Sequence, residues 1–318
     1  MHTAGEPGER QQAEGEADGP NDPHAVLAAT RTFVAHRNLL FTVAYEMLGS
    51  AADADDVLQE TWFRWVGVDT AQVDDQRAYL VRITTRQALN RLRSVKRRRE
   101  AYVGSWLPEP LLTTPDVAAD VELAESVSMG LMVVLETLTP TQRAVFVLRE
   151  AFGLGYDEIA AAVDKSPAAV HQIAHRARRH VEARRPRRRV TADEARAAVD
   201  AFQQALETRD LQGLLDILAP DVVAISDGGG IKQASPRPVI GADKVARFVV
   251  AGLTRHKIAL TAEPAAINGS PALALHIDGE LDGVLALRVE DTRIVGLYLV
   301  RNPHKLTYID SETVLTLR

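Results

Sequence analysis

Apolar residues recur at three- and four-residue steps through the first part of the chain, a period typical of helices that bury one face. A helix from about Ala25 is predicted to end at Gly49 and Ser50, because glycine breaks the pattern there. In the first helix this period is set by Val26, Phe33, Leu40, Val43, Ala44 and Met47. The same period predicts a second helix over Asp53–Val66 and a third over Gln76–Arg99. The front of the chain is therefore expected to be all helical.

A second helical block is predicted over Val117–Arg185. Within it, Thr139 with Gln142 three residues later forms a capping-box signal that starts a helix. A short helix over Asp157–Val163 is followed by a longer one with Ser166 as its N-cap. A short helix, a tight turn and a longer helix together make a helix-turn-helix layout.

The pattern changes after this block. Thr191 and Glu194 form another capping box that opens an amphipathic helix, and shorter helices are expected over Leu211–Leu218 and Asp243–Leu253. Strands are expected over Val222–Ser226, Ile258–Thr261, Leu273–Ile277, Val284–Val289 and Ile294–Val300. Helices first and strands after them predict an α+β domain with an antiparallel sheet.

Composition refines this division of the 318 residues. Residues 1–24 are acidic and nearly free of apolar side chains, so they are expected to be disordered. Two proline-containing stretches are interpreted as linkers, because proline interrupts helices. The predicted segments are 1–24 tail, 25–99 helical domain, 100–116 linker, 117–185 helix-turn-helix domain, 186–190 basic linker and 191–318 α+β domain.

Several classes of protein are excluded by composition. The chain has no cysteine, which rules out disulfides, a thiol nucleophile and a cysteine-based metal site. No apolar run reaches the ~18 residues needed to span a bilayer, and the first residues lack the order of a signal peptide. A cytoplasmic protein with no membrane contact is therefore expected. The net charge is −6, yet basic residues concentrate in Arg91–Arg99 and Arg176–Arg189, which suggests local contacts with a polyanion.

The third predicted helix carries a stripe of arginines around one asparagine, on a face away from its apolar stripe. Its members are Arg82, Arg86, Asn90, Arg93 and Arg97. Guanidinium groups grip phosphates and an amide can read base edges, so this face is a candidate for nucleic-acid binding. A solvated arginine face is the alternative.

The helix that starts at Ser166 sorts its residues in a similar way. Its outward positions are His171, Gln172, His175, Arg178 and Arg179. A recognition helix places its first exposed residues on bases and later cations on phosphates, which favours DNA binding over a surface helix of a plain bundle.

The second predicted helix has carboxylates on one face instead. Asp53, Asp56 and Glu60 lie within about 60° of one another at the helical period, and Trp62 and Trp65 are close by. Such a face can be a pair of acid/base or metal-binding groups, a solvated surface, or a protein-docking surface anchored by an aromatic residue.

These residues support a resemblance to group IV (extracytoplasmic-function) RNA polymerase sigma factors. Asp53-Ala-Asp-Asp-Val-Leu-Gln-Glu-Thr-Trp62 resembles their core-polymerase-binding segment, and Arg77-Ala-Tyr-Leu-Val-Arg-Ile-Thr-Thr-Arg-Gln-Ala-Leu-Asn-Arg-Leu-Arg-Ser94 is similar to their minus-10 region. Two further segments resemble their fourth region, which binds the minus-35 element. They are Leu138-Thr-Pro-Thr-Gln-Arg-Ala-Val-Phe-Val-Leu-Arg149 and Gly155-Tyr-Asp-Glu-Ile-Ala160. The resemblance covers about Ala25 to Arg185 and has its motifs in the family's order.

The resemblance implies core RNA polymerase and promoter DNA as partners, and no cofactor. Polymerase contacts are implied for Asp53, Asp56, Gln59, Glu60 and Trp62. Contacts with the minus-10 element are implied for Arg82, Arg86, Asn90, Arg93 and Arg97, and with the minus-35 element for Ser166, His171, Gln172, His175, Arg178 and Arg179.

The remaining part of the chain looks like a SnoaL-like domain of the nuclear-transport-factor-type cone fold, which a subgroup of these sigma factors carries as a regulatory extension. The residues that resemble the marks of the subgroup are Trp106, Leu107, Pro108, Glu109, Pro110, Asp227, Gly228, Gly229, Gly230, Asn302, Pro303, His304, Lys305 and Leu306. They are expected to form part of a contact between the extension and the sigma domains. His304 departs from the subgroup's usual Asp, and His171 stands where an Arg is more usual.

Two alternatives remain open at the level of the sequence. One is a stand-alone helix-turn-helix regulator that senses an unknown small ligand through the last domain, which leaves the acidic segment without a role. The other is a SnoaL-like enzyme, for which Asp227, His276, Asp278 and Asp282 are scattered acid/base candidates. Asp278-Gly279 and Asp282-Gly283 are more simply interpreted as turns.

Overall fold

The computed structural model describes residues 23–99, 101–114, 117, 120–184, 190–255 and 260–317. Residues 1–22 of the acidic tail expected over 1–24, and residues 186–189 of the basic linker expected over 186–190, lie outside this part of the chain. In the described part, no helix is both long and apolar enough to cross a membrane.

The first domain is a bundle of three helices, as its apolar period predicts. They are α1 (Pro23–Leu48), α2 (Ala51–Trp65) and α3 (Gln76–Arg99), with a short 3-10 turn, η1 (Thr70–Gln72), between the last two. Gly49 takes a left-handed φ of 66° and ends α1, while the Ser50 hydroxyl accepts a hydrogen bond from the Asp53 amide and starts α2.

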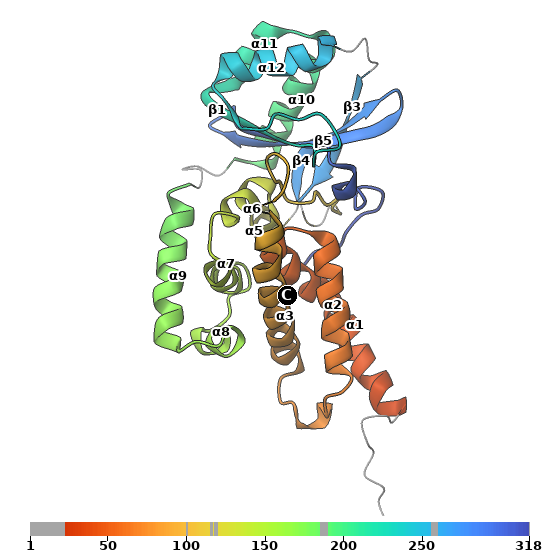
Figure 1. Cartoon of the computed structure of the whole chain (residues 1–318), viewed down its shortest axis with the longest axis vertical. Coiled ribbons are helices and arrows are strands. Elements are labelled where there is room, and N and C mark those ends of the chain that lie inside the picture. The colour runs from red at the N-terminus through yellow and green to blue at the C-terminus, as the bar shows by residue number, and fades with distance from the viewer. Residues whose placement is uncertain are drawn as a thin grey trace, which may run out of the picture.

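The second domain wraps around one side of this bundle (Figure 1). Its helices are α5 (Val121–Val127), α6 (Met129–Leu135), α7 (Pro140–Phe146) continuing into η2 (Val147–Ala151), α8 (Tyr156–Val163) and α9 (Pro167–Glu182). The capping box at Thr139 and the Ser166 cap are both present, and Asp164 turns the chain between α8 and α9 with a φ of 55°. The helix-turn-helix prediction is therefore confirmed.

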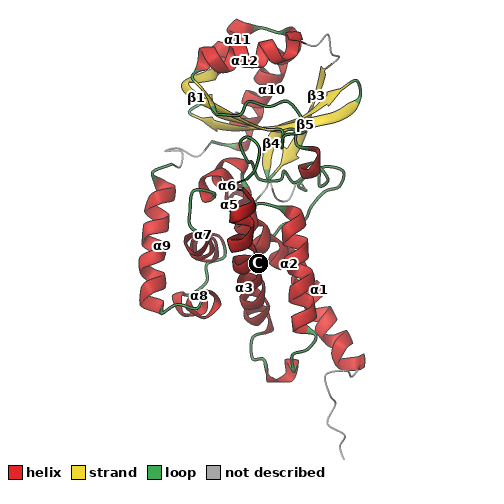
Figure 2. Ribbon diagram, viewed as in Figure 1, coloured by secondary structure: helices red, strands yellow, loops and turns green. Residues whose placement is uncertain are grey.

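The C-terminal domain is a six-stranded sheet with three helices on one face. The helices are α10 (Ala192–Thr208), α11 (Leu211–Ile217) and α12 (Ala242–Arg255). The strands are β1 (Leu218–Asp227), β2 (Val239–Ile240), β3 (Leu260–Ile267), β4 (Ser270–Ile277), β5 (Glu280–Glu290) and β6 (Arg293–Val300), in the order β2-β1-β6-β5-β4-β3. Figure 2 shows α10–α12 on one side of the sheet and the helical domains on the other.

Two details of this sheet differ from the sequence-based expectations. The sheet is mixed and not purely antiparallel, because β1 pairs with β6 in parallel, with Ile225 opposite Tyr298. Asp282 and Gly283 lie inside β5 and do not form a turn. Glycine is needed at position 283 because the Cβ of any other residue would lie 2.7 Å from the Val300 carbonyl oxygen. Asp278-Gly279 does form the β4–β5 turn. The strand expected over Ile258–Thr261 is present as β3 from Leu260, and residues 258–259 lie outside the described part of the chain.

The apolar cores join the domains instead of separating them. One continuous cluster includes Leu40 of α1, Ala88 of α3, Val145 of α7 and Ile159 of α8, so the two helical domains share a core. A second cluster lies between the sheet and α10–α12. A third lies on the opposite face of the sheet and includes Leu107 and Met129 from the helical half.

The chain end returns to the first domain, as the C label near α3 in Figure 1 shows. A short 3-10 turn, η3 (Pro303–Lys305), follows β6. Leu315 and Leu317 then join the helical core, and the Thr316 amide donates to the Thr42 hydroxyl at 3.1 Å. The C-terminal segment is thus part of the first domain's packing.

Candidate functional site

The acidic face of α2 is present and open to solvent. Asp56, Gln59 and Glu60 are exposed. Arg91 of α3 forms ion pairs with Asp53 and Asp56, at 2.6 Å from the Asp53 carboxylate. Arg91 therefore supplies the countercharge that holds both carboxylates in place, and the Asp56 side chain remains 55% exposed.

Two neighbouring aromatic residues, Trp62 and Phe63, lie at the edge of this acidic face. Trp62 is half-buried against the helical core, and Trp65 is fully buried with its indole N–H donating to the Ala29 carbonyl at 2.8 Å. Phe63 is 60% exposed and stands beside Trp62. Phe63 lies three residues after Glu60, a spacing that places both side chains on one face of the helix.

The arginine face of α3 is only partly free. Asn90 and Arg93 are exposed, whereas the Arg82 guanidinium lies over the Tyr79 ring at 4.6 Å from its centroid. Arg86 donates to the Ala161 carbonyl in α8 at 2.8 Å. The backbone of Arg97 belongs to α3, and its side chain lies outside the described part of the structure.

The outward face of α9 is exposed at four of its expected positions, namely His171, Gln172, His175 and Arg179. Arg178 instead forms an ion pair with Glu150 at 2.6 Å, which fixes α9 against the end of η2. Ser166 acts as the helix N-cap, accepting from the Ala169 amide at 3.3 Å. The ring of His171 packs against Tyr156 of α8, with 5.0 Å between ring centroids.

The end of β1 forms a buried polar hub. The Asp227 carboxylate is fully buried and accepts hydrogen bonds from the Tyr102 hydroxyl at 2.6 Å and the Leu107 amide at 2.9 Å. Lys305 forms an ion pair with it at 2.7 Å. Asn302 donates to the same Tyr102 hydroxyl at 2.7 Å. The expected motifs therefore meet at one place, and Tyr102, which belongs to none of the motifs, joins them.

The glycines after Asp227 are explained by close contacts. A side chain on Gly228 would overlap the Lys232 carbonyl, with its Cβ at 2.0 Å. Gly229 has a φ of 59°, and its Cβ would lie 2.3 Å from the Asn302 amide. This loop can pack against Asn302 only because it lacks side chains there.

The segment expected to be a linker is buried between the domains. The Glu109 carboxylate accepts from the Ala51 amide at 2.7 Å in the first turn of α2, where the helix dipole favours a negative charge. The Glu109 carbonyl accepts from the Tyr45 hydroxyl at 2.7 Å. Burial of this carboxyl raises its pKa, although the amide hydrogen bonds and Lys305 oppose the rise. Trp106 stacks under the Arg99 guanidinium, 3.5 Å from the ring centroid.

A second contact, centred on Asn268 in the β3–β4 turn, was not anticipated. Its side-chain amide donates to the Tyr45 hydroxyl at 2.7 Å and to the Val127 carbonyl at 2.8 Å, and its oxygen accepts from the Leu111 amide at 3.0 Å. The turn therefore touches α1, the end of α5 and the connecting segment at once. An Asn-Gly pair signals only a turn, so the sequence could not indicate these partners.

The chain end makes a third contact with the first domain. The Tyr308 hydroxyl donates to the Asp55 carboxylate of α2 at 2.6 Å, while Arg37 pairs with the other oxygen of Asp55 at 2.9 Å. Burial and the neighbouring Asp55 carboxylate raise the pKa of Tyr308. Both oxygens of Asp55 are thereby engaged within the chain and the residue is half-buried, whereas Asp56 and Glu60 stay exposed although Arg91 and Gln87 contact them.

The acid/base candidates of the C-terminal domain do not converge on one site. Asp227 belongs to the hub, Asp282 pairs with Arg301 and Lys232, and Asp278 lies in the β4–β5 turn. His276 is half-buried in β4 beside a register shift. Within the described residues, no cluster of three or more His, Asp or Glu side chains is arranged to hold a metal ion.

Comparison with known proteins accounts for both helical domains. Residues 32–98 match the family model for Sigma-70 region 2, and residues 128–181 match that for Sigma-70, region 4. The chain is 37% identical over 296 residues to the ECF RNA polymerase sigma factor SigJ of Mycobacterium tuberculosis, covering 86% of this chain and 92% of SigJ. This chain is an ECF RNA polymerase sigma factor. It is also 32% identical to the probable ECF sigma factor SigI of the same species, with 92% and 98% of the two chains covered.

The structural comparison extends the agreement to the third domain. The crystal structure of M. tuberculosis SigJ superimposes with a TM-score of 0.72 at 33% identity, covering 88% of this chain and 98% of that one. The expected architecture of two helical sigma domains followed by an α+β domain is therefore confirmed. As a sigma factor the chain directs transcription initiation with core RNA polymerase at promoter DNA, and the stand-alone regulator is set aside.

Proposed function

We propose that the exposed faces described above are the working surfaces of this sigma factor. The acidic face of α2, with Phe63 at its edge, binds core polymerase. The face of α3 around Asn90 and Arg93 binds the minus-10 element, and the outward face of α9 binds the minus-35 element. Their exposure, charge and place in the two matched regions support these roles.

We further propose that the structure is a closed form that cannot occupy a promoter. The two promoter elements are about 25 base pairs apart, which corresponds to roughly 85 Å of duplex. In the structure α3 and α8 touch, with the Arg86 guanidinium 2.8 Å from the Ala161 carbonyl. This contact carries the proposal, because the two DNA-binding domains must separate before each can reach its element.

The C-terminal domain holds the closed form together and acts as a regulator, not as a catalyst. The Asp227 hub ties it to the segment between the two sigma regions, and Asn268 ties it to both regions directly. Its acid/base groups are used in these contacts or lie apart from one another. The chain works in the cytoplasm, where core polymerase and DNA are.

Run-off transcription with the full-length chain and core polymerase tests this proposal, with the DNA upstream of the chain's own gene as template. Asp227→Asn keeps the size of the side chain but removes the charge that pairs with Lys305. Initiation is expected to rise several-fold over the wild-type chain. Asp221→Asn is the matched control, because Asp221 lies exposed on the same strand.

If Asp227→Asn retains its circular dichroism spectrum and co-elutes with core polymerase but initiates no more often than Asp221→Asn, then the hub does not restrain the sigma domains.

A further inference from the structure

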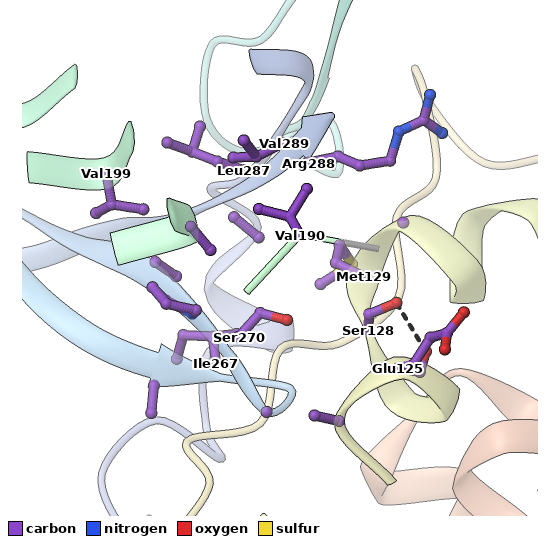
Figure 3. A pocket seen from close by; sticks show the side chains of 18 of the residues that line it. Glu125, Ser128, Met129, Val190, Val199, Ile267, Ser270, Leu287, Arg288 and Val289 are labelled. Carbon is purple, nitrogen blue, oxygen red and sulfur yellow. Dashed lines mark hydrogen bonds between the residues drawn. The ribbon is translucent and has the colours of Figure 1, made fainter. Parts of the chain in front are cut away.

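A cavity of about 620 Å³ lies between the region 4 helices and the sheet of the C-terminal domain (Figure 3). One wall is formed by α5 and α6, and another by strands β3–β5. The remaining side is closed by the first turns of α10 and by Val190, where the chain enters the C-terminal domain. A cavity of this size is within the range that holds a small organic molecule.

The cavity separates two apolar cores. Val199 and Leu287 belong to the core under α10–α12, whereas Met129 and Ile267 belong to the core on the opposite face of the sheet. The side chains labelled in Figure 3 surround the open space with mainly carbon atoms. Transfer of an apolar molecule from water into such a lining is favourable.

One hydroxyl points into this space. Ser270 begins β4 and is half-buried, and its hydroxyl makes no hydrogen bond with the described part of the chain. The Ser128 hydroxyl, by contrast, already donates to the Glu125 carbonyl at 2.9 Å. Ser270 is therefore the group that can pair with a polar atom of a ligand.

The charged groups of the lining offset one another. Arg184, Arg196 and Arg288 stand with Glu125 and Asp200, and Glu290 pairs with Arg288 at 3.2 Å. Glu290 lies outside the lining and neutralises Arg288 from there, and the two lining carboxylates match the other two arginines, so no net charge selects an ion. The lining thus favours an uncharged ligand over an anionic or cationic one.

From these observations we infer that the cavity binds an uncharged, largely apolar small molecule with one hydroxyl or carbonyl group directed to Ser270. The walls belong to two bodies, region 4 and the C-terminal domain. A ligand that touches both binds only while they are together, so it stabilises the closed form. This consequence rests on the proposed function, whereas the binding itself does not.

Fluorescence titration of the full-length chain with Nile red, an uncharged apolar dye, tests the binding. One dye per chain is expected, with a blue-shifted emission. Ala195→Phe places a ring into the cavity from α10 and is expected to weaken binding about tenfold or more. Ala197→Phe is the matched control, because Ala197 is exposed on the same helix and lies outside the cavity lining. Equal affinity of the two variants for Nile red overturns the site.

Competition for the bound dye tests the chemical class. Dodecan-1-ol is expected to displace Nile red at lower concentration than dodecanoate, and Ser270→Ala is expected to reduce this preference for the alcohol. Displacement by dodecanoate at the same or lower concentration overturns the assignment of an uncharged ligand.

Run-off transcription then separates the site from its consequence. Saturating dodecan-1-ol is expected to lower initiation by the wild-type and Ala197→Phe chains but not by Ala195→Phe. If the dye titration shows the site and transcription does not respond, the link to the closed form is overturned while the binding stands.

Discussion

The side-chain amide of Asn268 donates a hydrogen bond to the hydroxyl of Tyr45 across 2.7 Å, which joins a turn of the C-terminal sheet to the core of α1. Tyr45 is fully buried, and burial raises its pKa, while the hydrogen bond from Asn268 opposes that rise. Asn268 also bonds to Val127 and Leu111, so one side chain connects region 2, region 4 and the segment between them.

Loss of this side chain leaves several buried polar groups without partners. Asn268→Ala is expected to lower the free energy of unfolding by about 3 kcal/mol, because each unsatisfied buried group costs about 1–3 kcal/mol. Asn268 has a φ of 52°, so Asn268→Gly removes the side chain without the backbone strain of alanine and is expected to cost less. Urea unfolding measures both.

Asn38→Ala serves as the control for this comparison, since Asn38 is an exposed asparagine of α1. A loss of stability in Asn268→Ala no greater than in Asn38→Ala would show that the turn does not fasten the three parts together.

Glu46 predicts a pH dependence of stability. Burial raises its pKa to about 8, although the Ser126 hydroxyl that donates to it at 2.8 Å and the charge of Arg143 oppose the rise. Between the ordinary carboxyl range and pH 8 the folded chain keeps a proton that the unfolded chain releases. The contribution of Glu46 to the free energy of unfolding therefore falls as the pH rises through that window, by at most about 1.4 kcal/mol per pH unit.

Glu46→Gln removes this dependence and is expected to be more stable than the wild-type chain at pH 8. Glu182→Gln, an exposed position on α9, is expected to leave the pH profile of unfolding unchanged. Identical profiles for Glu46→Gln and the wild-type chain would contradict the assignment.

The exposed face of α9 predicts two separable effects on DNA binding by the polymerase holoenzyme. Arg179→Ala removes a cation from the phosphate-facing part and is expected to reduce the slope of log affinity against log salt by about one. Gln172→Ala is expected to lower discrimination between minus-35 sequences by about 1–3 kcal/mol with the salt slope unchanged. Fluorescence anisotropy of labelled promoter DNA over a salt series measures both the affinity and the salt slope. A changed salt slope in Gln172→Ala together with changed sequence discrimination in Arg179→Ala would contradict the assigned roles.

The C-terminal segment predicts a contrast between adjacent residues. Leu315 is 4% exposed within the helical core, whereas Val314 is 50% exposed. Leu315→Ala is expected to cost about 3 kcal/mol of unfolding free energy, and Val314→Ala less than about 0.5 kcal/mol. Thermal unfolding measures both, and similar values would show that the chain end is not part of the core.

Deletion of the whole C-terminal domain would also remove Leu315 from the helical core. Point substitutions therefore test regulation more cleanly than such a deletion.

Local signals in the sequence were sufficient for most helix starts. The capping boxes at Thr139 and Thr191 and the Ser166 cap lie where the sequence predicts them, because caps depend on residues within one turn. The acidic face of α2 follows from the helical period alone. Asp278-Gly279 forms a turn as expected, but Asp282-Gly283 lies in a strand, since the close approach of Val300 also requires glycine.

Contacts between distant parts of the chain could not be predicted in this way. The apolar period around Ile159 predicts a buried helix face, but it is the same whether that face packs within region 4 or against region 2. Asn268 lies 223 residues from Tyr45 in the sequence, and Tyr308 lies 253 residues from Asp55. The parallel pairing of β1 with β6 likewise depends on the path of the whole domain and not on either strand.

A distance measurement between the two DNA-binding regions shows whether they are held together in the free chain. The chain has no cysteine, so Ala35→Cys on α1 and Ala183→Cys after α9 place two dyes at exposed positions of an otherwise unlabelled protein. Energy transfer between the dyes is expected to be high in the free chain and to fall when core polymerase and promoter DNA are added. Transfer that is the same in the free chain and in the promoter complex would contradict the account.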